Sequence, residues 1–546
     1  MSKRGVRISA PVIFVLGFSF FCVISGVAGA QENPPQQNPT TNPLLVCTAC
    51  HIPKDGKLDS IESVRMTPEG WRMTLSRMVR NHGLALKEDE ARKILKYLSD
   101  NNGLAPSEIT PFEYALEERN STLETHDKAG VPPNVIGACV QCHSFARIAL
   151  QRRSPEMWTR LPDLHEYFVP FVASDTSSAG NLIDPWRQVA TKEAVPYFIK
   201  RFPFETPAWR TWQSTAKPDY SGKWLVVGHD PAKGGDYTGV LTVTSAENDV
   251  YSGKFIHDFQ DGSSVSGTTD AVLYTKFQWR GRAQEGDKTE VEIFFGNEDG
   301  TLMHGRRLLT PVGDLGMDET LYKAGSQAAL LTVIPRAIQA GQTVKVRLFG
   351  NKLPANVGAD AITLGDGLKV QSVSQSDENV VIAEIVADRD AQVGPRTIKI
   401  SGTTGDGQLY LYKKVDYISI SPERGYGRPG GSRGPKVAEQ FEASAFTHGP
   451  DGKPVNLGRV GPLTWDVAER VSRIGDDDVL YVGKVNEYGT FIPNTDGPNP
   501  EREHSESNVG DVWVEAWYKP DPSKPPMGAR AFMLLMPPKF VFNPIN

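Results

Sequence analysis

The chain has 546 residues, of which 39% are hydrophobic and 23% charged, with a formal net charge of −6 at pH 7. This composition is typical of a soluble globular protein, and the length indicates three or four domains. The acidic balance and the absence of a basic stripe argue against a nucleic-acid-binding protein.

The first thirty residues predict a secretory signal peptide. A basic start precedes an apolar run from Ala10 to Ala28, and small residues follow up to Ala30. We expect cleavage after Ala30, a periplasmic product and a linker rich in Pro, Asn and Gln over residues 31–43. A transmembrane anchor is the alternative, but serine and glycine interrupt the apolar run. No later stretch of the sequence is apolar enough to span a bilayer.

Two Cys-x-x-Cys-His motifs follow, in "VCTACHIPKDG" and "GACVQCHSFAR". They hold every cysteine that remains after signal cleavage, namely Cys47, Cys50, Cys139 and Cys142. A disulfide oxidoreductase needs one pair and no adjacent histidine, and a zinc site needs four ligands. A c-type haem uses every residue of the motif, because both thiols form thioethers and the histidine binds the iron. The sequence therefore predicts two covalent c-type haems, with His51 and His143 as proximal ligands.

A matching helix start lies downstream of each motif. Thr67-Pro68-Glu69 precedes Trp71 by two residues, and Ser154-Pro155-Glu156 precedes Trp158 in the same way. A hydroxyl N-cap followed by proline is typical of a helix start. Seven residues beyond each tryptophan stand Met78 and His165, which we predict as the sixth iron ligands. His82, Met73 and Met66 are the alternatives at the first haem, although methionines on an apolar face, Met157 among them, are more often core side chains.

A helix with an apolar stripe closes each half, over residues 87–103 and 192–202. The two halves form an all-α dihaem cytochrome c domain that we place at residues 44–205.

From about residue 206, alternating apolar and polar positions indicate strands. We predict an antiparallel barrel-like domain over 206–325 and two immunoglobulin-like sandwiches over 326–421 and 422–546. Four tryptophans are expected in the cores: Trp224, Trp279, Trp513 and Trp517. Three histidines are expected at the surface or in loops: His229, His257 and His304. The glycine-rich stretch 424–435 is expected to be a loop, and these domains show no Ser-His-Asp, zinc or dinucleotide-binding motif.

With "LLVCTACHIP" and "IGACVQCHSF" in front of three β domains, the chain resembles the α subunit of quinohemoprotein amine dehydrogenases of Gram-negative bacteria. The resemblance implies that this subunit has no catalytic residues for the amine. The quinone, a cysteine tryptophylquinone, would lie on a separate small subunit, and a β-propeller would be the third subunit of a heterotrimer. This chain would take electrons from the reduced quinone singly and pass them to a blue-copper protein or a c-type cytochrome. The resemblance also implies one bis-histidine and one His/Met haem.

Two other functions stay open on the sequence. A dihaem c-type cytochrome acting alone, such as a peroxidase, would need an open sixth position and neighbouring acid–base groups. A binding protein would use its β domains to hold a partner or a polysaccharide.

Overall fold

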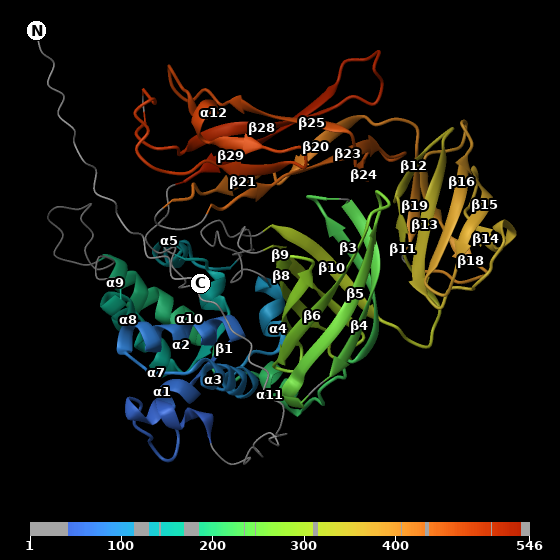
Figure 1. Cartoon of the computed structure of the whole chain (residues 1–546). Helices are drawn as coiled ribbons and strands as arrows, with labels where there is room; N and C mark the ends of the chain where they lie inside the picture. The colour runs from blue at the N-terminus through green and yellow to red at the C-terminus, as the bar shows by residue number, and fades with distance from the viewer. Residues whose placement is uncertain are drawn as a thin grey trace, which may run out of the picture.

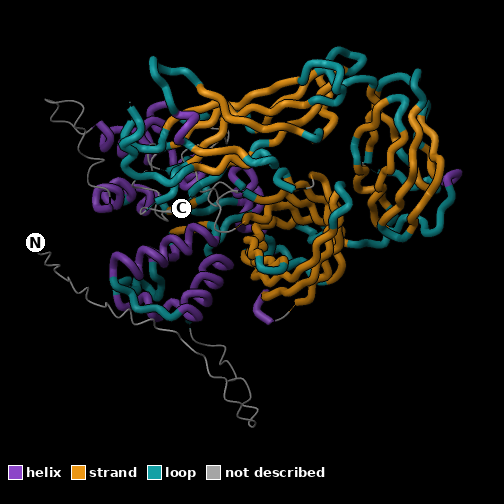
Figure 2. Tube along the Cα trace, turned by 45° about the horizontal axis from the view of Figure 1, so that its top comes forward, coloured by secondary structure: helices purple, strands orange, loops and turns teal. Residues whose placement is uncertain are grey.

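The computed structural model describes residues 42–113, 130–140, 143–168 and 185–536, apart from short gaps at 234, 246, 310–314, 406, 432–435 and 504. The predicted signal peptide, most of the predicted linker and Cys142 lie outside the described residues. Helices gather at one side of the molecule, and strands build the rest (Figures 1 and 2). This confirms the coarse fold class, a helical region followed by β domains.

The helical region consists of short helices in chain order: η1 (Pro43–Ala49), α1 (Asp59–Glu62), α2 (Pro68–His82), α3 (Glu88–Asn101), α4 (Pro106–Ile109), η2 (Thr110–Phe112), α5 (Pro133–Cys139), α6 (Ala146–Ala149), α7 (Pro155–Thr159), α8 (Leu161–Phe168), α9 (Pro185–Val189), η5 (Ala190–Ala194), α10 (Val195–Arg201) and α11 (Pro207–Ser214). Two strands join its halves, β1 (Val64–Met66) and β2 (Gln151–Arg153). They pair antiparallel with Arg65 opposite Arg152. Equivalent segments of the two halves therefore meet.

The two tryptophans of the repeat occupy equivalent places. The hydroxyls of Thr67 and Ser154 cap α2 and α7, as predicted. Trp71 and Trp158 are both buried. Each donates its indole N–H over 3.0 Å to the carbonyl that ends the closing helix of its half, Asn102 after α3 and Phe202 after α10. The same indole contact therefore ties the capped helix to the closing helix in both halves.

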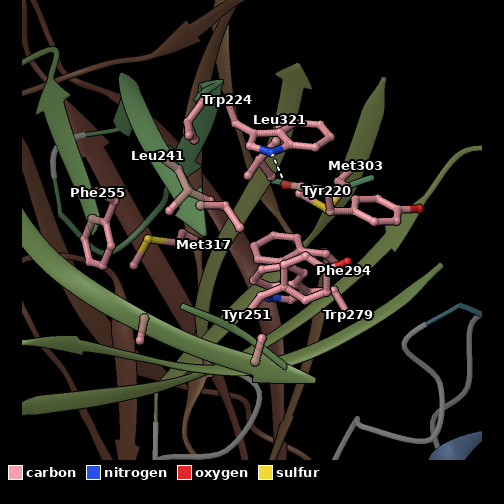
Figure 3. Close-up of a cluster of buried hydrophobic side chains, with 14 of the residues drawn as sticks. Tyr220, Trp224, Leu241, Tyr251, Phe255, Trp279, Phe294, Met303, Met317 and Leu321 are labelled. Carbon is pink, nitrogen blue, oxygen red and sulfur yellow. Dashed lines mark hydrogen bonds between the residues drawn. The ribbon is translucent and has the colours of Figure 1, made fainter. Parts of the chain in front are cut away.

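The second region is a closed antiparallel barrel of eight strands, which confirms the barrel prediction: β3 (Gly222–Asp230), β4 (Gly235–Ser245), β5 (Val250–Phe259), β6 (Ser264–Tyr274), β7 (Gln278–Glu285), β8 (Lys288–Gly296), β9 (Leu302–Leu309) and β10 (Gly316–Lys323). Trp224 and Trp279 lie in its aromatic core (Figure 3). Trp224 donates its indole N–H to the carbonyl of Tyr220 at 2.9 Å. A short helix, η6 (Glu247–Asp249), precedes β5.

The helical region packs directly on the barrel. Met73 of α2 shares an apolar core with Trp209 and Trp212 of α11 and with Phe277 and Phe295 at the barrel wall. Close by, Glu69 accepts a hydrogen bond from Arg280 Nε at 2.7 Å, and both side chains are largely buried. These contacts fix α2 against the barrel, and the predicted sites lie along that helix.

Two further β regions complete the chain, each around its own core. The first contains β11 (Ala329–Ile334), β12 (Ala337–Gln339), β13 (Thr343–Asn351), η7 (Ala359–Ala361), β14 (Ile362–Thr363), β15 (Leu368–Ser376), β16 (Val380–Ala387), β17 (Gly394–Thr397), β18 (Lys399–Ile400) and β19 (Gln408–Tyr412). The second contains β20 (Tyr417–Ser421), β21 (Arg424–Gly427), β22 (Glu439–Gln440), β23 (Glu442–His448), β24 (Pro454–Arg459), β25 (Leu463–Glu469), α12 (Asp478–Tyr481), β26 (Gly483–Val485), β27 (Thr490–Pro493), β28 (Gly510–Tyr518) and β29 (Met527–Leu535). The immunoglobulin-like topology and the domain boundaries stay predictions.

Three expectations for the β regions are wrong. On β28, Val512, Val514 and Ala516 face the core, so the alternating positions of Trp513 and Trp517 face outward, and Trp517 is 39% exposed. His257 of β5 is buried, whereas we expected a surface position. The first four residues of the glycine-rich stretch form β21, which pairs parallel with β29.

Candidate functional site

The first Cys-x-x-Cys-His motif lies near the surface. Cys47 is in η1 and half-buried, Cys50 is exposed, and the following Ile52 is 87% exposed. His51 N–H donates to the Cys47 carbonyl at 2.9 Å, and His51 Nδ1 lies 2.7 Å from Ser60 Oγ. Burial lowers the pKa of His51, and the charge of His82 lowers it further. A neutral imidazole oriented through Nδ1 is the form that binds a metal through Nε2.

The second motif lines a cavity of about 340 Å³ in the helical region. Cys139 ends α5 and is half-buried, and its sulfur and the His143 ring both belong to the cavity wall. Burial raises the pKa of the Cys139 thiol to about 12 and also raises that of Cys47. Redox-active Cys-x-x-Cys pairs have lowered thiol pKa values, so neither cysteine has the environment of a disulfide oxidoreductase.

Two histidines lie close together in the wall of this cavity, with their ring planes tilted by 43°. The ring centroids of His143 and His165 are 6.3 Å apart. Two imidazoles that bind one metal ion from opposite sides, each through a bond of about 2 Å, place their centroids about 6 Å apart. The structure therefore brings His165 to the distance at which it and His143 could hold one iron between them.

The protonation of both rings suits this arrangement. His143 Nδ1 lies 2.8 Å from the Ser144 carbonyl, and His165 Nδ1 lies 2.9 Å from the Leu161 carbonyl. A carbonyl only accepts, so each Nδ1 carries the proton and each Nε2 keeps a lone pair. Burial lowers the pKa of His143 to about 3 and also lowers that of His165, with nearby arginine charges adding to both. Both imidazoles are neutral at pH 7.

Helix α2 separates the two motifs. Its residues Gly70, Met73 and Arg77 line the cavity of the second motif. Met78 is half-buried and His82 is exposed, one helical turn apart and so on one face of α2. The charge of His82 lowers the pKa of His51, which places His82 near the first motif.

His82 also connects the two sites through ring contacts. Its imidazole stacks on Tyr167 at a centroid distance of 6.4 Å and meets Phe168 edge-on at 6.3 Å. Both aromatic residues belong to α8, the helix that carries His165, and Phe168 lines the second cavity. These ring contacts therefore hold the end of α2 against α8.

The remaining methionines are distributed in a way that the sequence did not indicate. Met66 and Met73 are buried, as expected of core side chains, and both line the cavity of the second motif, although we considered them as alternative ligands at the first haem. Met66 also belongs to the apolar core of the first half. Met157 instead packs with Cys47 against the apolar core of the first half. The antiparallel pairing of β1 with β2 explains this exchange, because it brings each half against the other.

Sequence reasoning missed Trp186. Its ring lies 5.7 Å from that of His165, and its indole N–H donates to the Ala138 carbonyl at 3.2 Å, beside Cys139. No repeat partner or motif marks this position in the sequence.

Four family models match the chain in consecutive segments. Residues 44–209 match "Quinohemoprotein amine dehydrogenase A, alpha subunit, haem binding". Residues 218–324, 327–413 and 418–545 match domains II, III and IV of the quinohemoprotein amine dehydrogenase alpha subunit. No curated protein matches the chain.

Solved structures match parts of the chain weakly. A redesigned β-barrel is 14% identical and covers 19% of this chain and 92% of its own, with a TM-score of 0.17. Drosophila N-cadherin EC1-4 is 10% identical, covers 60% and 95%, and has a TM-score of 0.16. The cadherin-like domains 1 to 4 of zebrafish RET are 8% identical, cover 55% and 66%, and have a TM-score of 0.18. In the described part of the chain, no helix combines the length and the apolar character that a membrane span needs.

Proposed function

The chain belongs to the family of quinohemoprotein amine dehydrogenase α subunits, and from this premise we propose that it is the electron-transfer subunit of a periplasmic amine dehydrogenase. It takes electrons one at a time from a cysteine tryptophylquinone on a separate small subunit. It delivers them to a soluble acceptor such as a blue-copper protein or a c-type cytochrome. A β-propeller subunit completes the complex. The family membership supports the oxidoreductase complex, and the two motifs support the haem-carrying role.

The residues that would hold the haems follow from the two motifs. Cys47 and Cys50 would form the thioethers of the first haem, and Cys139 and Cys142 those of the second. When bound, each haem supplies an iron that exchanges a single electron. Two such sites match a two-electron quinol to a one-electron acceptor.

At the second site, His143 and His165 are the proposed axial ligands. The centroid distance of 6.3 Å between their rings is the observation that carries the proposal. The carbonyls of Ser144 and Leu161 hold the tautomers that leave a lone pair on Nε2 of each ring. Trp186 packs against His165 and restricts its rotation. A peroxidase would need this sixth position open, and His165 as the sixth ligand would close it.

At the first site, His51 is the proposed proximal ligand and Met78 the proposed sixth ligand. His82 is the competitor, since it lies near His51. The ring of His82 packs against Tyr167 and Phe168 of α8 in the second half. This packing favours Met78 as the ligand. Methionine at one iron and histidine at the other would give the two haems different potentials.

Purification from the native host tests this proposal. Intact mass spectrometry should show two haem additions on a chain that begins near Gln31, together with a small subunit and a larger one. A chain that carries fewer haems, or that purifies alone with peroxidase activity, would overturn it.

A further inference from the structure

Four arginines line the cavity of the second motif. Arg80 is exposed, and the other three come from three different elements: Arg77 on α2, Arg147 on α6 and Arg153 on β2. Arg153 is 8% exposed, and Nη1 of Arg147 is buried without a hydrogen-bond partner. The hydrogen bonds that Arg77 and Arg153 do make go to neutral groups, the Thr74 hydroxyl and the Gln151 amide oxygen.

Among the described residues, no carboxylate forms an ion pair with any of these three arginines. Burial lowers the pKa of Arg147 to about 9 and that of Arg153 to about 10, and the charge of Arg77 lowers both further. The neighbouring buried pair Arg65 and Arg152 shows the contrast, because both bind the carboxylate of Glu108. A buried cation without a counter-charge is costly, so this cluster of three fits an anionic ligand.

We infer that Arg77, Arg147 and Arg153 bind the two propionates of the haem attached at Cys139. This inference rests on the proposed function, since it concerns the same cavity. The cavity wall already contains the thiol that attaches the haem and the two histidines that would bind its iron. The propionates are the anionic groups that a haem brings, and guanidinium forks bind carboxylates through paired hydrogen bonds.

The cluster has a consequence for the redox balance. Two propionates would neutralise two of the three positive charges of this cluster, which would leave at least one positive charge in the cavity that holds the haem. A nearby positive charge favours the ferrous state, which carries one positive charge fewer than the ferric state. The three arginines therefore raise the potential of a haem that its bis-histidine ligation would otherwise keep low.

The test compares Arg147→Gln, Arg77→Gln and Arg147→Lys in the purified complex, with the exposed Arg92→Gln on α3 as the control. Spectroelectrochemistry resolves the two midpoint potentials, and resonance Raman spectroscopy reports the propionate bending band. Each glutamine variant should lower the reduced-to-oxidised ratio of the second haem about tenfold at a fixed potential, which is a fall of about 59 mV. Its propionate band should shift, while the first haem stays unchanged.

Arg147→Lys separates charge from geometry. The lysine keeps the charge but loses the fork, so the potential should return toward that of the unmodified protein while the Raman band stays shifted. If Arg147→Gln does not fold, Arg77→Gln and Arg147→Lys still decide the matter, because Arg77 is only half-buried and lysine keeps the charge.

Two haems with unchanged potentials and an unchanged propionate band in every variant would overturn the inference that these arginines bind the propionates. The proposed electron-transfer role would remain intact. An unmodified protein without a second haem would instead overturn the proposed function.

Discussion

Replacing Glu108 by glutamine should destabilise the helical region by about 3–5 kcal/mol, the usual cost of removing one partner of a buried ion pair. Glu108 accepts hydrogen bonds from Arg65 Nη1 at 2.8 Å and from Arg152 Nε at 3.1 Å. Arg65 and Arg152 are cross-strand neighbours on β1 and β2. Their side chains are 1% and 8% exposed and that of Glu108 is 6% exposed. Water therefore cannot solvate the two arginine charges that the substitution leaves without a carboxylate.

The assay is denaturant unfolding followed by the Soret absorption, which reports the helical region rather than the β domains. Glu88→Gln on α3 is the control, because its ion pair with Arg92 is exposed and its loss should cost about 0.3–0.5 kcal/mol. A Glu108→Gln variant that unfolds at the same denaturant concentration as this control would refute the reasoning.

The pH dependence gives a second check on Glu108. Burial by itself would raise the pKa of Glu108, but hydrogen bonds and the charges of Arg65 and Arg152 hold it below the ordinary value. The stabilisation is therefore fully present above the unfolded pKa of about 4.3. It is lost as the pH falls through the lower folded pKa. The difference between Glu108→Gln and the unmodified protein should shrink below about pH 4.

His165→Ala should turn one haem high-spin in the absorption spectrum and leave the other low-spin, whereas two unchanged low-spin haems would exclude His165 as a ligand. Met78→Ala should abolish the near-infrared sulfur-to-iron band and lower one potential; if His82→Ala alters the first haem's ligation and Met78→Ala does not, His82 is the ligand. His229 of β3 binds Glu442 of β23 at 2.8 Å, and although burial opposes its charge, Asp236 and Glu442 raise its pKa to about 9. This stabilisation is full below the unfolded pKa of about 6.5 and is lost as the pH rises through about 9. The protection factors of the β23 amides, which are corrected for the intrinsic pH dependence of exchange, should therefore fall above pH 9 in the unmodified protein but not in His229→Gln.

The local features of the helical region could be predicted because they depend on residues that are close together in the sequence. The hydroxyl caps at Thr67 and Ser154 and the paired tryptophans follow from a repeated pattern of a few positions, and the structure shows them in equivalent places. The closed barrel followed in the same way from regular alternation between turn residues.

Features that depend on tertiary arrangement could not be predicted. Which cavity Met66 and Met73 line depends on the antiparallel meeting of β1 and β2, and nothing in the local sequence specifies that pairing. His257 is buried because the barrel interior holds polar partners, with Arg307 3.4 Å from its ring nitrogen, and a histidine on an alternating strand gives no sign of this. The cluster of three arginines in the cavity wall comes from three separate elements and shares no motif: Arg77 is on α2, Arg147 on α6 and Arg153 on β2.

Anaerobic rapid mixing of the purified native complex with its amine substrate tests the central claim most directly. We expect the α bands of two haems per chain to appear after quinone reduction and to disappear again when an oxidised blue-copper protein or cytochrome is added. Quinone reduction with both haems remaining ferric, while the soluble acceptor is still reduced, would show that electrons bypass this chain and would contradict the account.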